Sequence, residues 1–488
     1  MTTRTEHDSL GSLAVPSSAY YGAQTQRAVT NFPISGWRMP SRFIHALGRI
    51  KRAAAQTNLE LGLLDKKIAD AIVAASTEVV GGGLDTQFPV DIFQTGSGTS
   101  TNMNANEVIA SRANELLGGK RGDKAPVHPN DHVNLCQSSN DVIPTAIHLS
   151  VIEAVEAELL PALKQLHMVL TRKSKEFDDI ITIGRTHLQD ATPIRLGQEF
   201  SGYAAQIENG MGRCTRIIET LQELPLGGTA VGTGVNAHPE FAWRATEKLA
   251  DELGLALRES KNHFEASAAR DACVEASGQV KTIAVSLAKI ANDIRLLASG
   301  PRCGLGELKL PAVQPGSSIM PGKVNPVIAE STIQVCLWVI GADTTITLGG
   351  LQSFFELNVA MPLIGAQLIE SVELLAKVSR NFADNCVAGI EADRERCESL
   401  VERSLAMCTP LAPVIGYDNA AAISKIAHET GKTIREVAAT ESGLSQDELD
   451  KLFNLRSLTD PGARDAAAST PAAPPVPAPV PASLSQSR

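Results

Sequence analysis

The feature that most constrains this fold is a heptad seam of apolar residues between Ala266 and Ser299. Its members, from Cys273 to Leu297, are spaced alternately three and four residues apart. A helix with that period packs along its whole length against neighbouring helices at a shallow angle. The spacing is repeated in a second segment, Leu196 to Leu221, and in a third, Leu368 to Phe382. The sequence therefore predicts a bundle of long helices.

Two further segments extend this bundle. Val142 to Leu170 has helical spacing, and Pro161 is expected to kink it or end a turn. Val327 to Leu348 is apolar nearly all round, and its length favours a helix buried on every side over a strand. Helices of roughly 25–35 residues are about 40–50 Å long, which exceeds what one compact domain needs. We therefore expect an all-α fold whose central bundle is completed by other subunits.

The rest of the chain is organised around this bundle. Shorter helical stretches occur at about 41–62 and 66–80, and short amphipathic helices return at about 420–430 and 446–453. The expected parts are a mostly helical N-terminal domain (1–137), the central bundle (138–394), a small C-terminal helical domain (395–463) and a disordered tail rich in alanine and proline (464–488).

Composition argues against several classes of protein. The chain has 44 Lys and Arg against 54 Asp and Glu, a net charge of −10, and only 4% aromatic residues, so a nucleic-acid surface is not expected. No apolar run reaches the ~18 residues of a transmembrane helix, and the N-terminus has no apolar signal core. The eight cysteines lack metal-ligand spacing and are expected to be thiols in a reducing compartment. We expect a cytoplasmic protein that binds neither nucleic acid nor membrane.

Four polar, glycine-bearing segments interrupt the helical pattern: Asp91–Asn106, Val127–Asp141, Gly184–Pro193 and Pro315–Pro326. Each is dense in hydroxyls, amides and glycine, which leave backbone N–H groups and short donors free to meet an anion. The last one, PGSSIMPGKVNP, adds Lys323 ahead of a long helix whose N-terminus favours negative charge. The pattern GxxxxGK[ST] is absent, so a nucleotide P-loop is not indicated.

The histidines in these segments are less informative on their own. A single histidine such as His187 is more often structural than catalytic, and its neighbours leave both roles open. His128 and His132 have a spacing that could suit a metal, but Pro129 and the missing glutamate of an HExxH pattern count against it. We expect no metal site.

The segment PGSSIMPGKVNP is similar to the signature of the fumarase/aspartase superfamily, and from about residue 3 to 460 the chain resembles the class II, iron-independent fumarases. The resemblance implies a three-domain all-α fold, reversible hydration of fumarate to L-malate in the tricarboxylic acid cycle, no cofactor, and a homotetramer whose active sites each use three subunits. The further motifs that carry it are YYGAQTQRA (20–28), TGSGTSTNMNANE (95–107), HPNDHVN (128–134), QSSNDV (137–142), GRTHLQDATP (184–193), GGTAVGTG (227–234), SGPRCGLGE (299–307) and FELN (355–358).

The resemblance also implies roles for single residues. Ser317 would be the catalytic base, and His187, paired with Glu330, would handle the leaving water. Lys323 would stabilise the developing charge and, with Asn325, hold a substrate carboxylate. Substrate binding is also implied for Ser97, Thr99, Ser138, Ser139, Asn140 and Thr186.

A second, peripheral dicarboxylate site of the family corresponds to His128, Asn130 and Asp131. The family pattern has a basic residue three positions before this histidine, where this chain has Ala125, so binding there stays open.

Two other functions are left as alternatives. Aspartase, an ammonia-lyase, shares the fold and the loop signature. The sequences at 138–140 and 95–97 and His128 favour fumarase, whereas the sequences at 20–22 and 327–330 favour aspartase. A structural oligomer with a relic site is the second alternative. It would be expected to have lost at least one of Ser317, Lys323, Asn325 or His187, and all four are present.

Overall fold

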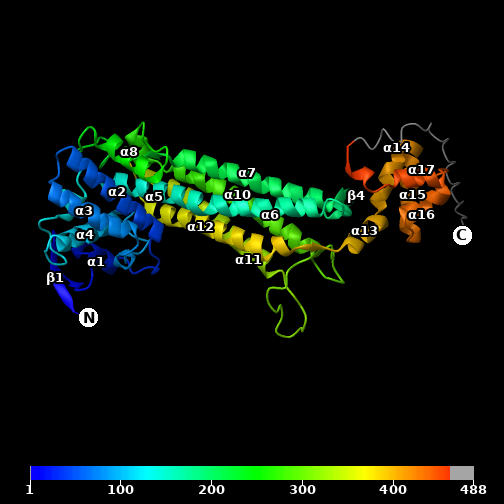
Figure 1. Ribbon diagram of the computed structural model, residues 1–488, viewed down its shortest axis with the longest axis horizontal. Coiled ribbons are helices and arrows are strands. Elements are labelled where there is room, and N and C mark those ends of the chain that lie inside the picture. The colour runs from blue at the N-terminus through cyan, green and yellow to red at the C-terminus, as the bar shows by residue number, and fades with distance from the viewer. Residues whose placement is uncertain (1, 462–488) are drawn as a thin grey trace, which may run out of the picture. The chain divides into compact units, whose positions relative to one another are not determined.

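The computed structural model describes residues 2–461, which form mostly helices joined by loops and two-stranded sheets (Figure 1). The predicted helical fold is confirmed, with short strands that the sequence did not reveal. The expected disordered tail at 464–488 lies outside the described residues.

The chain divides into two compact units, each described by itself. The expected boundaries near residues 137 and 394 stay a prediction. Unit 1 comprises Met1–Gln165, Ile207–Lys289 and Ser331–Arg380, and unit 2 comprises Leu166–Gln206, Ile290–Glu330 and Asn381–Arg488.

Unit 1 begins with a β-hairpin followed by packed helices. The predicted helices at 41–62 and 66–80 are confirmed, and the first buries a face that includes Ile44, Leu47 and Ile50. The elements are β1 (Thr3–Asp8), β2 (Gly11–Pro16), α1 (Ala23–Asn31), α2 (Ser41–Glu60), α3 (Lys66–Val80), η1 (Asp85–Gln87), α4 (Thr99–Leu116) and the π-helical η2 (Pro129–Val133).

The predicted long helices are present close to their expected bounds. The segment predicted at 142–170 is broken by a π-helical turn, η3 (Val155–Leu159), directly before Pro161; such turns are a common cause of helix bends. The long helices are α5 (Ser139–Ala154), α6 (Leu160–Glu176), α7 (Leu196–Leu221), α10 (Asp271–Leu297), α11 (Val327–Gly350) and α12 (Met361–Asn385).

Glycines let three of these helices approach one another within unit 1. A Cβ at Gly349 of α11 would lie 2.9 Å from Ile364 of α12, and one at Gly365 of α12 would lie 2.9 Å from Ile147 of α5. Because the side chains of neighbouring helices occupy the space that a Cβ would need, glycine permits this packing.

Helix α11 corrects one expectation. It was expected to be buried on every side, but in the single chain Leu337 is 62% exposed, Trp338 47% and Leu348 57%. By length and composition alone it is also the one helix among residues 2–461 that could cross a membrane, although its apolar residues do not form an unbroken run. A long apolar helix with an uncovered face is also what an incomplete bundle requires.

Unit 2 contains a hairpin and a cluster of C-terminal helices. The cluster has its own apolar core, which includes Val401, Leu411, Ile423 and Val437. The expected helices near 420–430 and 446–453 are confirmed. The elements are β3 (Ile181–Thr186), β4 (Gln189–Arg195), β7 (Leu308–Lys309), β10 (Glu391–Ala392), α13 (Arg394–Arg403), α14 (Ala412–Ile415), α15 (Tyr417–Thr430), α16 (Ile434–Glu441) and α17 (Gln446–Leu452).

The remaining short elements connect these parts. In unit 1 they are β5 (Glu223–Leu224), α8 (Phe241–Leu253), β6 (Arg258–Glu259), α9 (His263–Ala268), β8 (Ser353–Phe354) and β9 (Leu357–Asn358). In unit 2 they are η4 (Val387–Gly389), η5 (Leu405–Leu411) and η6 (Ser457–Thr459).

Candidate active site

Three hydroxyl groups from two of the polar segments form a hydrogen-bonded chain in unit 1. Ser97 Oγ lies 2.7 Å from Thr99 Oγ1, which lies 2.7 Å from Ser139 Oγ. Thr99 begins α4 and Ser139 begins α5, so the N-termini of two helices meet here. The next residue, Asn140, donates through Nδ2 to the carbonyl of Ala230 at 2.7 Å. The hydroxyl groups and the positive ends of two helix dipoles make this cluster suited to an anion.

Two glycines give the first segment its shape. Gly98 precedes α4 with φ of +72°, a left-handed conformation, and a Cβ there would lie 2.9 Å from Ile143. A Cβ at Gly96 would lie only 2.1 Å from the carbonyl oxygen of Val359, and the carbonyl of Gly96 accepts the N–H of Met361 at 3.1 Å. The close approach of two backbones therefore sets the position of the hydroxyl groups between and beside these glycines.

Asp141 anchors the start of α5. It forms a capping box with Ser138, whose N–H donates to Oδ1 at 2.9 Å. Its other oxygen, Oδ2, accepts the N–H groups of Gly227 at 3.0 Å and Thr229 at 2.9 Å. The carboxyl is fully buried, and this burial raises its pKa to about 6 although the N–H groups act in the opposite direction. One carboxylate thus joins the segment at 138–141 to the glycine-rich motif at 227–234.

Lys51 of α2 lies in the polar interior next to this segment. It is 0% exposed, and Nζ donates to Asn134 Oδ1 at 2.9 Å and to Gln137 Oε1 at 3.0 Å. Burial lowers its pKa to about 7, while the charge of Asp141 acts to raise it. Sequence reasoning missed both charged residues. The spacing of Ser138 and Asp141 is a capping-box pattern that could have revealed the aspartate, whereas a lysine next to apolar Ile50 gives no comparable signal.

The PGSSIMPGKVNP segment forms a loop in unit 2 that closes on itself. Ser317 Oγ accepts the N–H groups two and three residues later, at 3.3 Å and 3.0 Å. The N–H of Gly316 donates to the carbonyl of Lys323 at 2.9 Å, and Asn325 Nδ2 donates to the carbonyl of Gly316 at 2.5 Å. The Lys323 side chain is exposed, whereas Ser317 and Asn325 are half-buried. Ser317, Lys323 and Asn325 therefore all lie on this one loop.

His187 stands at the tip of the β3–β4 hairpin in unit 2. Thr186 pairs with Gln189, so His187 and Leu188 form a two-residue turn with φ of +57° and +60°. Left-handed conformations at both positions are typical of a type I′ turn, and they are costly for residues other than glycine. The sequence had indicated only a polar segment here. Within residues 2–461 no hydrogen bond or ion pair joins His187 to Glu330, which lies in the first turn of α11, so their pairing stays a prediction.

Two motifs meet in unit 2 through a buried carboxylate. Glu307, which is 0% exposed, ends the SGPRCGLGE segment and forms an ion pair with Arg185 of the hairpin, Nη1 to Oε2, at 2.7 Å. Thr182 of the same hairpin donates its hydroxyl to Glu307. These bonds fix the strand that leads to His187.

The comparisons with known proteins extend over nearly the whole described chain. A lyase family model matches residues 11–341, and a model of the fumarase C C-terminus matches residues 407–460. The class II fumarate hydratase of Methylorubrum extorquens is 54% identical over 461 residues, which cover 94% of this chain and 98% of that one. The chain belongs to the class II fumarate hydratase family.

Two further members of this family show the same extent of similarity. The class II fumarate hydratase of Neisseria meningitidis is 51% identical over 452 residues, 93% of this chain and 98% of that one. The crystal structure of a class II fumarase from Schistosoma mansoni superposes with a TM-score of 0.92 at 43% identity, covering 94% of this chain and all of that one. The predicted membership in the fumarase/aspartase superfamily is confirmed.

The second dicarboxylate site expected for the class II fumarases lies at η2. His128 Nδ1 accepts the N–H groups of Asn130 at 3.3 Å and Asp131 at 3.2 Å, and the N–H of His128 donates to His132 Nδ1 at 2.8 Å. The imidazole of His128 thus caps its own segment, and binding of a ligand here stays a prediction. In the described part of the chain, no group of three or more His, Cys, Asp or Glu side chains is arranged to hold a metal ion.

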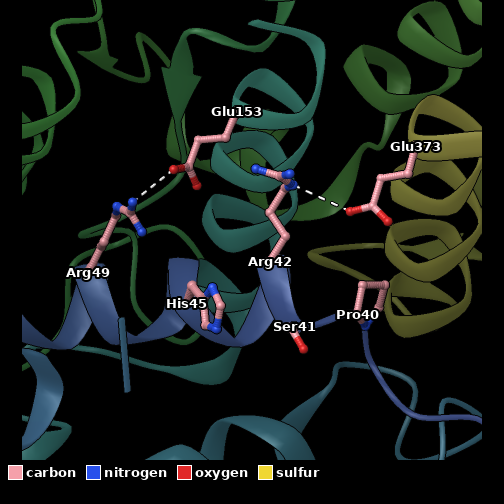
Figure 2. Close-up of a pocket in the computed structure, with 7 residues that line it drawn as sticks. All are labelled: Pro40, Ser41, Arg42, His45, Arg49, Glu153 and Glu373. Atoms are coloured by element: carbon pink, nitrogen blue, oxygen red, sulfur yellow. Dashed lines mark hydrogen bonds and ion pairs between the residues drawn. The ribbon is translucent and has the colours of Figure 1, made fainter. Parts of the chain in front are cut away.

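A cavity of about 400 Å³ in unit 1 is lined by none of the residues predicted for the fumarase site (Figure 2). Its charged side chains are paired with each other, Arg49 with Glu153 at 2.9 Å and Arg42 with Glu373 at 3.4 Å. Burial raises the pKa of Glu153. Because these ion pairs join α2 to α5 and α12, we infer that the charged side chains of the cavity hold these three helices together. The lining residues are Pro40, Ser41, Arg42, His45, Arg49, Glu153 and Glu373.

Proposed function

We propose that this chain is a fumarate hydratase, which catalyses the reversible hydration of fumarate to L-malate in the tricarboxylic acid cycle. The observation that carries the proposal is the hydroxyl cluster at the N-termini of α4 and α5. Hydroxyl and N–H donors that converge on one point match the carboxylate of a small dianion. Relatives at 51–54% identity are class II fumarate hydratases, which favours hydration over the aspartase alternative.

The reaction requires the removal of a proton from carbon next to a carboxylate that is already negative. Additional negative charge therefore develops on this carboxylate in the intermediate. Preorganised hydrogen-bond donors must stabilise that charge. Loss of one such donor typically costs about 2.7–4 kcal/mol. In this proposal Ser97, Thr99 and Ser138–Asn140 bind a carboxylate of the substrate.

Ser317 is the proposed base. A serine acts as a base only as the alkoxide, and hydrogen bonds donated to the oxygen favour this form. The two backbone N–H groups that point at Ser317 Oγ, at 3.3 Å and 3.0 Å, support this role. His187, with Thr186 beside it, is proposed to handle the leaving water, with Glu330 as its partner.

Lys323 and Asn325 are proposed to hold substrate from the loop. A lysine about 4 Å from a carboxylate contributes about 4 kcal/mol at an effective dielectric constant near 20. Asn325 donates one N–H of its amide to the carbonyl of Gly316, which leaves its second N–H as the donor for a carboxylate. A loop that changes shape when substrate binds can also exclude water from the reacting atoms.

The proposal includes a homotetramer with active sites shared between subunits. The exposed apolar face of α11, with Leu337, Trp338 and Leu348, supports an extended contact with other copies. Light scattering coupled to gel filtration should give about four times the 51.6 kDa mass of the chain, and a monomer would contradict this part.

A cytoplasmic location is also proposed, and the state of the cysteines supports it. All eight cysteines lie within the described residues, and all are free thiols. Unpaired thiols in such number are typical of a reducing compartment.

The test of the proposed reaction is a comparison of two substrates. The purified protein is incubated with L-malate and, separately, with L-aspartate, and fumarate is followed by its ultraviolet absorbance. We expect fumarate from malate. Formation of fumarate from aspartate alone would overturn the assignment and make the chain an ammonia-lyase.

A further inference from the structure

Buried hydrogen bonds that meet at Asn134 connect α4 to the segment that precedes α5. Asn134 Oδ1 accepts from Lys51 Nζ at 2.9 Å, from Asn102 Nδ2 at 3.2 Å and from Asn106 Nδ2 at 3.1 Å. Asn102 lies one turn after the start of α4. Lys51 also holds Gln137 at 3.0 Å, two residues before the start of α5. The ammonium group thus contacts the segment before α5 directly, and Asn134 connects it to α4.

The other end of the same segment is held by Asp141. Its carboxylate accepts the N–H of Ser138, so the residues from 134 to 141 are fastened at one end by a lysine and at the other by an aspartate. The substrate-binding candidates Ser138, Ser139 and Asn140 lie between these two attachments in sequence. Movement at either attachment would therefore change where their donors point.

The charge of Lys51 needs an explanation, because full burial of an ammonium is costly. Its hydrogen-bond acceptors are neutral amides, and the charge of Asp141 offsets only part of the effect of burial. An apolar side chain could fill the same space without this cost. A positive charge with little screening next to an anion site, by contrast, attracts a dianion more strongly than an exposed charge does.

We propose that Lys51 is a positioning residue of the dicarboxylate site: it fixes the N-termini of α4 and α5 against each other, and its charge strengthens binding of the dianionic ligand. This inference rests on the proposed function, because the ligand is the substrate of that reaction. It adds a residue from α2, outside every motif that carries the family resemblance.

The titration of Lys51 gives the proposal a consequence for the pH dependence of ligand binding. Burial lowers the pKa of Lys51 to about 7, so its charge is lost as the pH rises through neutrality. The groups that contact Lys51 Nζ are the amides of Asn134 and Gln137, and the carboxylate of Asp141 from α5 acts on its charge. Helices α3, α4 and α8 and the π-helical η2 also pack against α2, and η2 carries Asp131 and His132. Ligand binding should therefore weaken above neutral pH.

The test measures the Kd of succinate by calorimetry together with KM and kcat for L-malate. Succinate is a saturated dicarboxylate without a leaving group, and both its carboxylates are ionised above about pH 6. In Lys51→Met we expect Kd and KM to rise about tenfold while kcat changes less than about threefold, because the binding of ground state and transition state is weakened alike. In Lys51→Arg, whose charge does not titrate, Kd should stay constant from about pH 7 to about pH 9, above the pKa of Asp141.

Lys173→Met is the matched control. Lys173 is also buried, and its Nζ donates to the carbonyl of Ile390 at 2.7 Å in unit 2. Loss of this bond should lower the melting temperature and leave KM and Kd within about twofold. A purely structural role of Lys51 would give the same pattern in Lys51→Met, and that result would overturn the proposal.

The pH profile keeps the proposal testable if the variants do not fold. In the wild-type protein, the Kd of succinate should rise between about pH 6 and about pH 9. A flat profile refutes the role of the Lys51 charge. If succinate binds as expected but malate is not dehydrated, the proposed reaction fails and the role of Lys51 in binding stands. If succinate does not bind at all, the role of Lys51 in binding is refuted, and the malate assay alone decides the proposed reaction.

Discussion

Replacement of Gly96 by alanine tests whether close backbone packing holds the hydroxyl cluster. A Cβ at this position would lie 2.1 Å from the carbonyl oxygen of Val359, and real Cβ contacts essentially never fall below 3.0 Å. The two backbones must therefore separate by at least about 0.9 Å. Ser97 and Thr99, and Thr99 and Ser139, are each 2.7 Å apart, so a displacement of this size takes at least one pair beyond hydrogen-bond range.

The cost of this displacement can be estimated for the reaction. A misplacement of about 1 Å at a reacting centre costs about a hundredfold in rate, or about 2.7 kcal/mol. We expect kcat/KM for L-malate to fall by about this factor in Gly96→Ala, as measured by fumarate absorbance. Gly83→Ala is the control, because a Cβ there meets only Glu78 O at an ordinary 3.5 Å. If Gly96→Ala keeps kcat/KM within threefold of the wild type, the hydroxyl cluster is not the binding site that we describe.

Three further substitutions test catalysis, proton linkage and assembly. Ser317→Ala should keep the assembly and the melting temperature but lose malate turnover by about 10³-fold or more, because the base is removed; retained turnover would exclude Ser317 from this role. Burial lowers the pKa of His148 from 6.5 to about 4, so the unfolded chain takes up the proton first as the pH falls. The free energy of unfolding should then drop by about 2 kcal/mol from pH 7 to pH 5 in urea titrations at fixed protein concentration, and His148→Gln should remove this part of the drop. Trp338→Asp places a charge on the exposed face of α11 and should reduce the mass measured by light scattering; an unchanged tetramer would show that this face lies outside the interface.

The long helices could be predicted from the sequence because their signal extends over many turns. The heptad spacing from Cys273 to Leu297 corresponds to α10, and the spacing from Leu196 to Leu221 gives the bounds of α7. The hairpin of β3 and β4 could not be predicted, since its turn is formed by His187 and Leu188 rather than by the glycine or asparagine that usually indicate a type I′ turn. A turn that depends on tertiary contacts gives no periodic pattern in the sequence.

The candidate site was predicted as four separate segments, and the structure connects two of them. Thr99 and Ser139 are 40 residues apart in sequence, and only the fold reveals their 2.7 Å contact. The roles of Lys51 and Asp141 in holding the hydroxyl cluster were missed. These roles depend on the burial of both side chains, and burial cannot be read from the sequence. The exposed face of α11 differs from its predicted burial for a related reason: apolar composition shows that a helix can be buried, but not which neighbours cover each of its faces.

The charges and dipoles of the candidate site determine how strongly it binds its ligand. The chain carries a net charge of −10, yet the proposed ligand is a dianion. Attraction must then be local, and most of the proposed donors are neutral hydroxyls and amides at helix N-termini, which bind a carboxylate less tightly than an arginine fork does. Weak binding of the ground state leaves more of the interaction energy for the intermediate, in which the negative charge is greater. For this reason the loss of a donor from the hydroxyl cluster should lower kcat, as the removal of Ser317 should, and not only raise KM.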